Sequence, residues 1–210
     1  MARIDDYITA VSLGKNELTG KDPKQIARRS GAIYVEETNG KTKLSINFLN
    51  REIDISWPEL DFAYSLDSNE VPIQQQVLLL HYLNLAEDVK ISGEWIAYQE
   101  VPDGKFYLDA FLRRAKNPMV QGFGNNPELL VKLTTEVYGA TPMEQGDQAV
   151  RIQALPLIPV ALILWEGDDE FTPEGTILFD RSVAQVLSAE DIAWLAGMII
   201  YPLLGMAAGL

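Results

Sequence analysis

Two apolar runs separated by an acidic turn constrain the fold of this chain most strongly. The first run covers residues 158–165, and the second covers residues 177–179. Continuous apolar runs bounded by turn residues are typical of buried strands. The segment between them is rich in carboxylates, namely Glu166, Asp168, Asp169, Glu170 and Glu174. The sequence therefore predicts two buried strands joined by an acidic, solvent-facing turn.

Other segments favour a mixture of helices and strands. Helical spacing or helix start signals are found at residues 3–13, 23–29, 72–86, 128–138 and from 189 onward. Strand patterns cover residues 32–36, 44–48 and 52–57, with Asn39-Gly40 as a hairpin turn between the first two. We therefore expect an α+β fold, an antiparallel or mixed sheet packed with helices in a single compact domain.

The expected order within that domain has three parts. Helices and a β-meander occupy residues 1–60, a central helix and core occupy residues 71–200, and an apolar tail occupies residues 201–210. The tail belongs to an uncharged stretch, residues 192–210, that is nearly long enough to span a bilayer. Pro202 and the absence of flanking basic residues favour a buried helix instead, with a dimer contact as the second alternative.

The charge restricts the partners. The formal net charge is -13, although residues 1–50 carry 8 basic and 6 acidic side chains. Nucleic acid and anionic bilayers both require positive potential, so we expect no nucleic-acid partner, and a membrane partner is disfavoured. Without a leader pattern at its start, the chain is expected in the cytoplasm.

The residue inventory restricts the chemistry. The chain has no cysteine, which excludes a thiolate nucleophile or an iron–sulfur cluster held by this chain. His81 is the only histidine, so a two-histidine metal site would need a second chain. The acidic turn could supply oxygen ligands to calcium or magnesium, but it lacks the spacing of a known calcium loop. We therefore expect no metal there.

A basic segment is the best local candidate for an anion site. Arg113, Arg114 and Lys116 precede a glycine-containing stretch that we expect to be a loop, residues 117–126, and that leads into a helix. Helix N-termini bind anions through free backbone N–H groups. The candidate anion-binding residues are Arg113, Arg114, Lys116, Gly122, Gly124 and Asn126. The alternative is a flexible loop whose basic side chains pair with carboxylates.

Three segments resemble an uncharacterised prokaryotic family, domain of unknown function 3786. They are Leu78-Leu79-Leu80-His81-Tyr82-Leu83, then residues 93–104 (GEWIAYQEVPDG), and then residues 158–182, which end in Leu178-Phe179-Asp180-Arg181-Ser182. The resemblance covers residues 71–200. It implies no catalytic residues, and some relatives carry a separate cysteine-rich iron–sulfur segment that this chain lacks.

Two functional hypotheses follow. The first is a cytoplasmic binding or accessory module, without evident catalysis, for a small anionic ligand or a protein partner, acting as a homodimer. The second is an enzyme with a dispersed acid–base or divalent-metal site that uses His81, Tyr82, Glu166 and Asp168. The cofactor is open in both cases. A pocket that contains His81 and the acidic turn would favour the enzyme.

Overall fold

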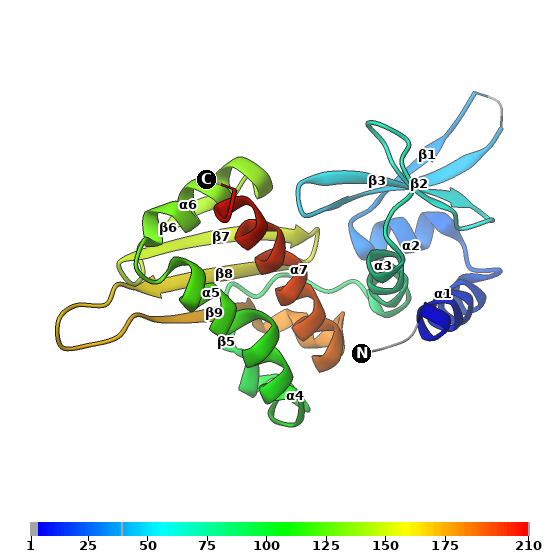
Figure 1. Ribbon diagram of the computed structural model, residues 1–210. Coiled ribbons are helices and arrows are strands. Elements are labelled where there is room, and N and C mark those ends of the chain that lie inside the picture. Colours follow the sequence, from blue (N-terminus) through cyan, green and yellow to red (C-terminus); the bar gives the residue numbers. More distant parts are fainter. Residues whose placement is uncertain (1–3, 39, 210) are drawn as a thin grey trace. The chain divides into compact units, whose positions relative to one another are not determined.

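The computed structural model describes residues 4–38 and 40–209 (Figure 1). Contacts between residues divide the chain into two compact units. The first extends to Lys90 and includes Leu155–Leu157 and Gln185–Leu187, and the second comprises the remaining residues. The predicted α+β class is confirmed, with helices packed on antiparallel sheets. Two compact units can belong to one domain, so the predicted single domain and its three parts stay a prediction.

The first unit contains a four-stranded antiparallel sheet in the order β1-β2-β3-β4. Its strands are β1 (Ile33–Glu36), β2 (Thr42–Phe48), β3 (Arg51–Trp57) and β4 (Phe62–Tyr64). The predicted meander of three strands is therefore confirmed, and β4 extends it. Of the predicted turn, Asn39 lies outside the described residues, whereas Gly40 has a positive φ of 79°, the conformation that such a turn requires.

Side chains alternate between the two faces of this sheet, as they must in extended strands. Leu44, Ile53 and Ile55 are fully buried on one face. Lys43 and Asp54 belong to the opposite face, because the side chains of neighbouring strand residues point in opposite directions. The sheet therefore presents one core face and one polar face, and the polar face carries the candidate site below.

Helices α1 (Ile4–Leu18), α2 (Pro23–Ser30) and α3 (Ile73–Leu85) complete the first unit. As expected, α2 begins after Asp22, whose side chain accepts a hydrogen bond from the Lys24 N–H, and ends at Gly31. Helix α1 packs on α3, where the Asn84 side chain donates to the Gly14 carbonyl at 3.1 Å. The helix expected at residues 3–13 is present in α1, although Ile4, Ile8 and Leu13, whose helical spacing indicated it, are exposed.

The second unit contains a five-stranded sheet in the order β5-β9-β8-β7-β6. The strands are β5 (Trp95–Ala97), β6 (Thr141–Met143), β7 (Gln148–Leu155), β8 (Ile158–Trp165) and β9 (Glu174–Asp180). The two buried strands predicted on either side of the acidic turn are β8 and β9, and they pair antiparallel. A short 3₁₀ turn, η1 (Tyr98–Glu100), follows β5.

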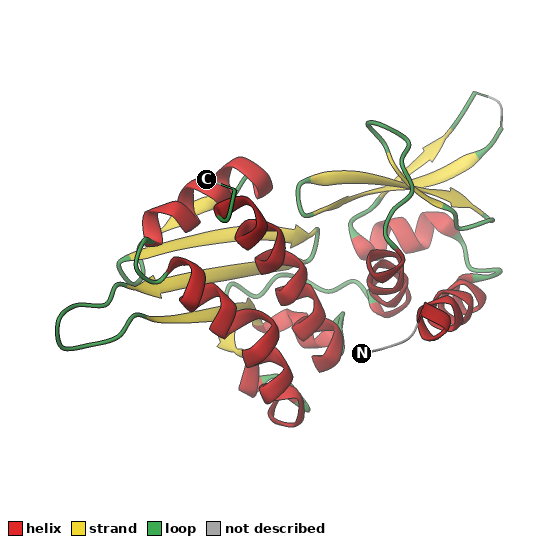
Figure 2. Ribbon diagram, in the orientation of Figure 1, coloured by secondary structure: helices red, strands yellow, loops and turns green. Residues whose placement is uncertain are grey.

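A layer of helices covers one face of this sheet (Figure 2). The layer contains α4 (Gly104–Phe111), the π-helical turn η2 (Leu112–Lys116), α5 (Asn117–Phe123), α6 (Pro127–Tyr138) and α7 (Ala189–Ala207). Tyr98 and Phe111 stack at 4.2 Å, and Phe179 of β9 meets both rings edge-on. These aromatic rings join the helices to the sheet.

Helix α7 continues through Pro202 into the predicted tail, which is therefore helical as far as Ala207. Ile192, Leu195, Ile199 and Leu203 are fully buried, as expected for one helical face. Among the described helices, α7 alone has the length and apolar character needed to cross a membrane, and half of its most apolar stretch is buried within the protein. Core helices of soluble proteins have the same properties.

Candidate functional site

The two candidates on the central helix α3 differ in exposure. His81 is half-buried. Tyr82 is fully buried, and its hydroxyl donates to the Ser30 carbonyl at 2.6 Å and accepts from the Leu157 N–H at 3.2 Å. Burial raises the pKa of Tyr82. At neutral pH this hydroxyl stays protonated and holds α2 and the 155–157 segment against α3, so its role is structural.

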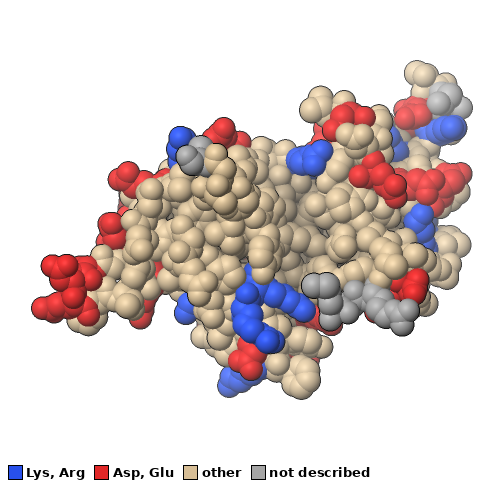
Figure 3. Space-filling view, viewed as in Figure 1, with Lys and Arg blue, Asp and Glu red and all other residues tan. Residues whose placement is uncertain are grey.

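The acidic turn between β8 and β9 is exposed, as predicted, and forms a cluster of negative charge at the end of the hairpin (Figure 3). Asp168 accepts hydrogen bonds from the N–H groups of Glu170 and Phe171, at 2.8 and 2.7 Å. These bonds lower the pKa of Asp168. Within residues 4–38 and 40–209, no group of three acidic or histidine side chains could hold a metal ion.

The dispersed catalytic site would draw on both units. His81 and Tyr82 belong to the first unit, and Glu166 and Asp168 belong to the second. The site therefore stays a prediction.

The basic segment is helical, and the predicted loop at residues 117–126 is wrong for residues 117–123 and confirmed for residues 124–126 alone. Arg113, Arg114 and Lys116 lie in η2, within a helical stretch that runs from Gly104 to Phe123. The Arg113 Nε donates to the Asp109 carbonyl at 3.2 Å, and the Arg114 guanidinium lies 5.6 Å from the Trp194 ring centroid. The sequence suggested a loop because Asn117-Pro118 and two glycines are turn residues, yet proline is tolerated in a first helical turn.

The rest of the predicted anion site has packing and capping roles. A side chain at Gly122 would collide with Leu204 of α7, and one at Gly124 would meet Pro173. Asn126 caps α6 by accepting a hydrogen bond from the Leu129 N–H at 3.3 Å. Lys116 precedes Gly124 by eight residues, which is about 12 Å of helix. The structure therefore does not bring the basic side chains to the start of α6.

Lys116 instead lines a small pocket of about 280 Å³, together with Asn117, Gln121 and Glu174. A carboxylate beside the only cation among these four side chains weakens the attraction for an anion. This pocket is therefore a poor match for the anion site predicted from the sequence.

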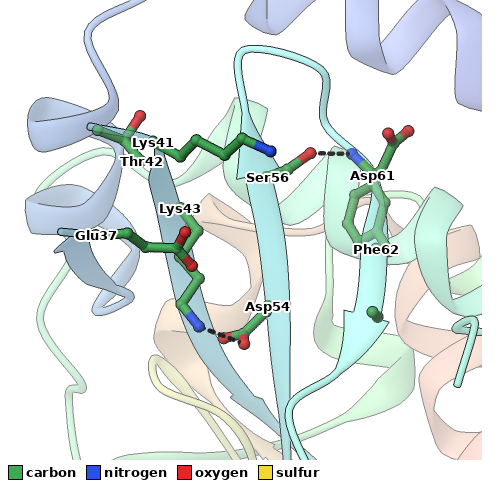
Figure 4. A pocket seen from close by; sticks show the side chains of 9 residues that line it. Glu37, Lys41, Thr42, Lys43, Asp54, Ser56, Asp61 and Phe62 are labelled. Atoms are coloured by element: carbon green, nitrogen blue, oxygen red, sulfur yellow. Dashed lines mark hydrogen bonds and ion pairs between the residues drawn. The ribbon is translucent and has the colours of Figure 1, made fainter. Parts of the chain in front are cut away.

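A larger pocket, of about 370 Å³, lies on the polar face of the first sheet (Figure 4). Lys43 of β2 and Asp54 of β3 form an ion pair at 2.6 Å on this face. The Lys41 side chain extends toward Ser56, and Ser56 Oγ accepts a hydrogen bond from the Asp61 N–H at 3.0 Å. The remaining lining residues are Glu37, Thr42, Phe62 and Ala63.

The Lys43–Asp54 ion pair dominates the electrostatics of this pocket. Asp54 Oδ2 binds Lys43, whereas Asp54 Oδ1 is buried and has no hydrogen-bond partner among the described residues. The hydrogen bond to Asp54 raises the pKa of Lys43, despite the opposing effect of burial. Lys43 is therefore a fixed cation, held in place by its ion pair with Asp54. Sequence reasoning missed this pocket, although the alternating charged and apolar residues of the meander carried a signal for a polar sheet face.

Two of the three segments that resemble a family, residues 93–104 and 158–182, meet at a second polar cluster. The Asp180 carboxylate, which is 1% exposed, accepts hydrogen bonds from Ser92, Gly93 and Ser182 at 2.6–2.9 Å. Beside it, Arg181 pairs with Glu94 through two hydrogen bonds of 2.6 and 2.8 Å. We call Ser92, Gly93, Glu94 and Asp180–Ser182 the Asp180 clasp. It fixes the start of β5 to the end of β9.

The profile of a family described as Domain of unknown function (DUF3786) matches residues 22–201. The chain belongs to this family. No curated protein and no solved structure matches it. The DUF3786 match includes the β-meander and α2, so it extends further toward the N-terminus than the resemblance seen in the sequence.

Both polar clusters lie within the DUF3786 region, whereas α1 and residues 202–207 of α7 lie outside it. Each cluster is complete within one compact unit. The Asp180 clasp has its carboxylate saturated by protein donors, so it is structural. The pocket at Asp54 is a cavity lined by charged and polar side chains, and it is the better candidate for a functional site.

Proposed function

We propose that this DUF3786 protein is a binding module for a small ligand that carries an anionic group, and that the pocket at Asp54 is its binding site. The observation that carries the proposal is the pocket of about 370 Å³ on the polar face of the first sheet, lined by the ammonium groups of Lys41 and Lys43 and by the Ser56 hydroxyl. Charged and polar side chains that line one cavity favour a polar ligand of complementary charge.

The side chains around Asp54 support binding through directed polar contacts. Lys41 and Lys43 supply positive charge, and the Ser56 hydroxyl can donate a hydrogen bond while its oxygen accepts one from Asp61. The volume of about 370 Å³ is at the small end of the range for ligand pockets. An anionic group of the ligand would therefore lie toward Lys41 and Ser56.

The same groups favour binding over acid–base catalysis. The raised pKa of Lys43 keeps its ammonium protonated, so it cannot serve as a general base near neutral pH. Thr42 donates its hydroxyl to the Trp57 carbonyl at 3.4 Å. We also propose that the protein has an accessory role in the cytoplasm and acts as a homodimer. It would act without nucleic acid, because its net charge of -13 opposes binding to a polyanion.

Amide chemical shifts of the full-length chain test the binding site. Small carboxylates, amino acids and inorganic phosphate are added at millimolar concentration. We expect at least one of them to shift the backbone amides of residues 41–43 and 54–56. Lys41→Gln should weaken that binding by about tenfold, which corresponds to about 1.4 kcal/mol.

Lys132→Gln is the matched control, because Lys132 belongs to α6 in the second unit and does not line the pocket. It should leave binding unchanged. If no compound in the set shifts the pocket amides, the proposed site is wrong.

A further inference from the structure

The outer strand of the first sheet, β1, has an open edge of backbone hydrogen-bonding groups. We infer that β1 of one copy pairs antiparallel with β1 of a second copy, so that two four-stranded sheets join across a two-fold axis. This pairing supplies the interface of the homodimer proposed above and rests on that proposal. It does not depend on ligand binding in the pocket at Asp54.

The ladder between β1 and β2 determines which backbone groups of β1 point outward. The Glu37 N–H donates to the Lys41 carbonyl at 2.8 Å, and the antiparallel register continues from there along β1. In such a ladder, residues that bond to the neighbouring strand alternate with residues whose N–H and C=O groups point to the other side. Val35 therefore bonds to β2, whereas the backbone groups of Tyr34 and Glu36 point away from the sheet.

The other three edge strands of the two sheets are closed. On β4, the outward N–H of Tyr64 donates to the Asn69 carbonyl at 2.9 Å. On β5, the N–H of Ala97 donates to the Glu100 carboxylate at 2.7 Å, and β6 contains Pro142, which has no N–H. Proteins protect edge strands in such ways because an open edge pairs with other chains. Among the described edge strands, β1 alone has neither a proline nor a hydrogen-bonded cover.

The outward groups of β1 are self-complementary. When Tyr34 of one copy lies opposite Glu36 of the other, the outward residues form two hydrogen-bonded pairs, which share four backbone hydrogen bonds. Val35 then lies opposite its own copy on the two-fold axis, in a pair without hydrogen bonds, where side chains approach most closely. Ile33, which is 64% exposed, lies diagonal to that valine on the same face and gains an apolar neighbour.

Charge complementarity favours a second copy over an arbitrary extended peptide. The Lys24 ammonium of α2 lies 5.0 Å from the centroid of the Tyr34 ring. In the two-fold register, Glu36 of the second copy lies directly opposite Tyr34 and on the face that carries this ammonium. Each copy therefore offers a carboxylate to the lysine of the other, and a two-fold interface repeats every contact in this reciprocal way.

Hydrogen exchange of the full-length wild type tests the pairing residue by residue. Samples at millimolar and at low micromolar concentration are compared, and sedimentation velocity gives the mass of each. The Tyr34 and Glu36 amides should be protected in the concentrated sample and should exchange at least tenfold faster after dilution. The Val35 amide should stay protected in both samples, because it bonds to β2 in the monomer as well.

A proline variant tests the edge directly. Glu36→Pro removes one outward N–H and places a ring against the second copy, but it leaves the hydrogen bonds between β1 and β2 in place. The dissociation constant measured by sedimentation should rise at least tenfold. Protection of the Val35 amide in this variant shows that the sheet is intact. If the variant fails to fold, the exchange of the wild type still decides the question.

A charge exchange tests the register. Lys24→Glu should weaken the dimer at least tenfold, because it places two carboxylates together in each of the two symmetric contacts. The double variant Lys24→Glu with Glu36→Lys should restore the dimer, since it exchanges the two charges. Lys132→Glu, in α6 of the second unit, is the matched control and should leave dimerisation unchanged.

Two results would overturn the inference in distinguishable ways. If the wild type sediments as a monomer at every concentration, the homodimer and its interface both fail. If it dimerises while the Tyr34 and Glu36 amides exchange as in the dilute sample, or if Glu36→Pro dimerises like the wild type, the β1 interface is wrong and the homodimer stands. Neither result bears on the pocket at Asp54, which the chemical shifts test separately.

Discussion

The carboxylate of Asp180 illustrates how a single residue holds distant segments together. Its oxygens accept hydrogen bonds from Ser92 and Gly93, which precede β5, and from Ser182, which follows β9. Hydrogen bonds to a charged group each contribute about 1.5–3 kcal/mol. A buried carboxylate with several such bonds is therefore a stabilising element of the second unit, and its charge is essential to that role.

The first prediction concerns the charge of Asp180. Asp180→Asn places an amide N–H₂ against backbone donors, so we expect the free energy of unfolding to fall by about 2–3 kcal/mol at pH 7. Asp169→Asn, in the exposed acidic turn, is the matched control and should leave stability unchanged. Urea unfolding of the three proteins measures the difference. An Asp180→Asn protein as stable as the wild type would show that the clasp is dispensable.

The same carboxylate predicts a dependence of stability on pH. Burial alone would raise the pKa of Asp180, but the hydrogen bonds from Ser182 and Ser92 outweigh it and lower the pKa to about 2. A lowered folded-state pKa gives a stabilisation that is fully present above the ordinary value of 3.8 and is lost as the pH falls toward 2. Between pH 5 and pH 2 the wild type should therefore lose about 2 kcal/mol more than Asp180→Asn. Urea unfolding of both proteins at pH 5 and pH 2 measures this difference. If the wild type and Asp180→Asn lose the same free energy of unfolding between these pH values, the prediction is wrong.

At the scale of elements, close helix packing decides where a side chain can be added. A Cβ on Gly14 of α1 would lie 2.8 Å from Leu80 Cβ of α3, a contact that forces the two helices apart. A Cβ on Gly205 of α7 would meet nothing within 4 Å. The two glycines lie in regular helices and differ only in their surroundings.

We expect opposite effects from the same substitution at these positions. Gly14→Ala should lower the free energy of unfolding by about 1–3 kcal/mol through overpacking. Gly205→Ala should raise it by about 0.5–1 kcal/mol, because alanine loses less backbone entropy on folding. Thermal unfolding of both variants measures the shifts. A stabilised Gly14→Ala protein would mean that α1 and α3 are not in close contact in solution.

At the scale of the whole molecule, the net charge of -13 and the burial of α7 both lead us to expect no binding to an anionic membrane. The face of α7 formed by Ile192, Leu195, Ile199 and Leu203 is buried within the second unit. Moving this face into lipid would break its packing contacts within the second unit. The net negative charge of the protein also opposes its approach to an anionic surface. The apolar character of α7 is therefore already used by the fold.

Vesicle flotation tests this expectation. The full-length protein should remain unbound to vesicles of mixed phosphatidylcholine and phosphatidylserine at physiological salt, and lowering the salt should not induce binding. A bound fraction would show that α7 leaves the second unit. Light scattering of the same sample tests the proposed homodimer.

The local elements of this protein could be predicted because short-range interactions specify them. Asp22-Pro23 and Gly31 set the ends of α2, and Gly40 supplies the positive φ of the first hairpin. The apolar runs that became β8 and β9 were visible because strands buried on both sides lack polar residues. The segment at residues 117–123 was mistaken for a loop, because local turn signals there are outweighed by packing against α7.

The candidate sites were decided by tertiary structure. The residues of the pocket at Asp54 come from β2, β3 and their neighbours, and those of the Asp180 clasp lie almost ninety positions apart in the sequence. Strand register places Lys43 and Asp54 on one face, and register depends on which face is buried. The sequence by itself determined the net charge and, through interactions between neighbouring residues, most of the secondary structure. Only the fold determined which polar atoms are buried and which keep a place for a ligand, because burial and hydrogen bonding depend on residues distant in the chain.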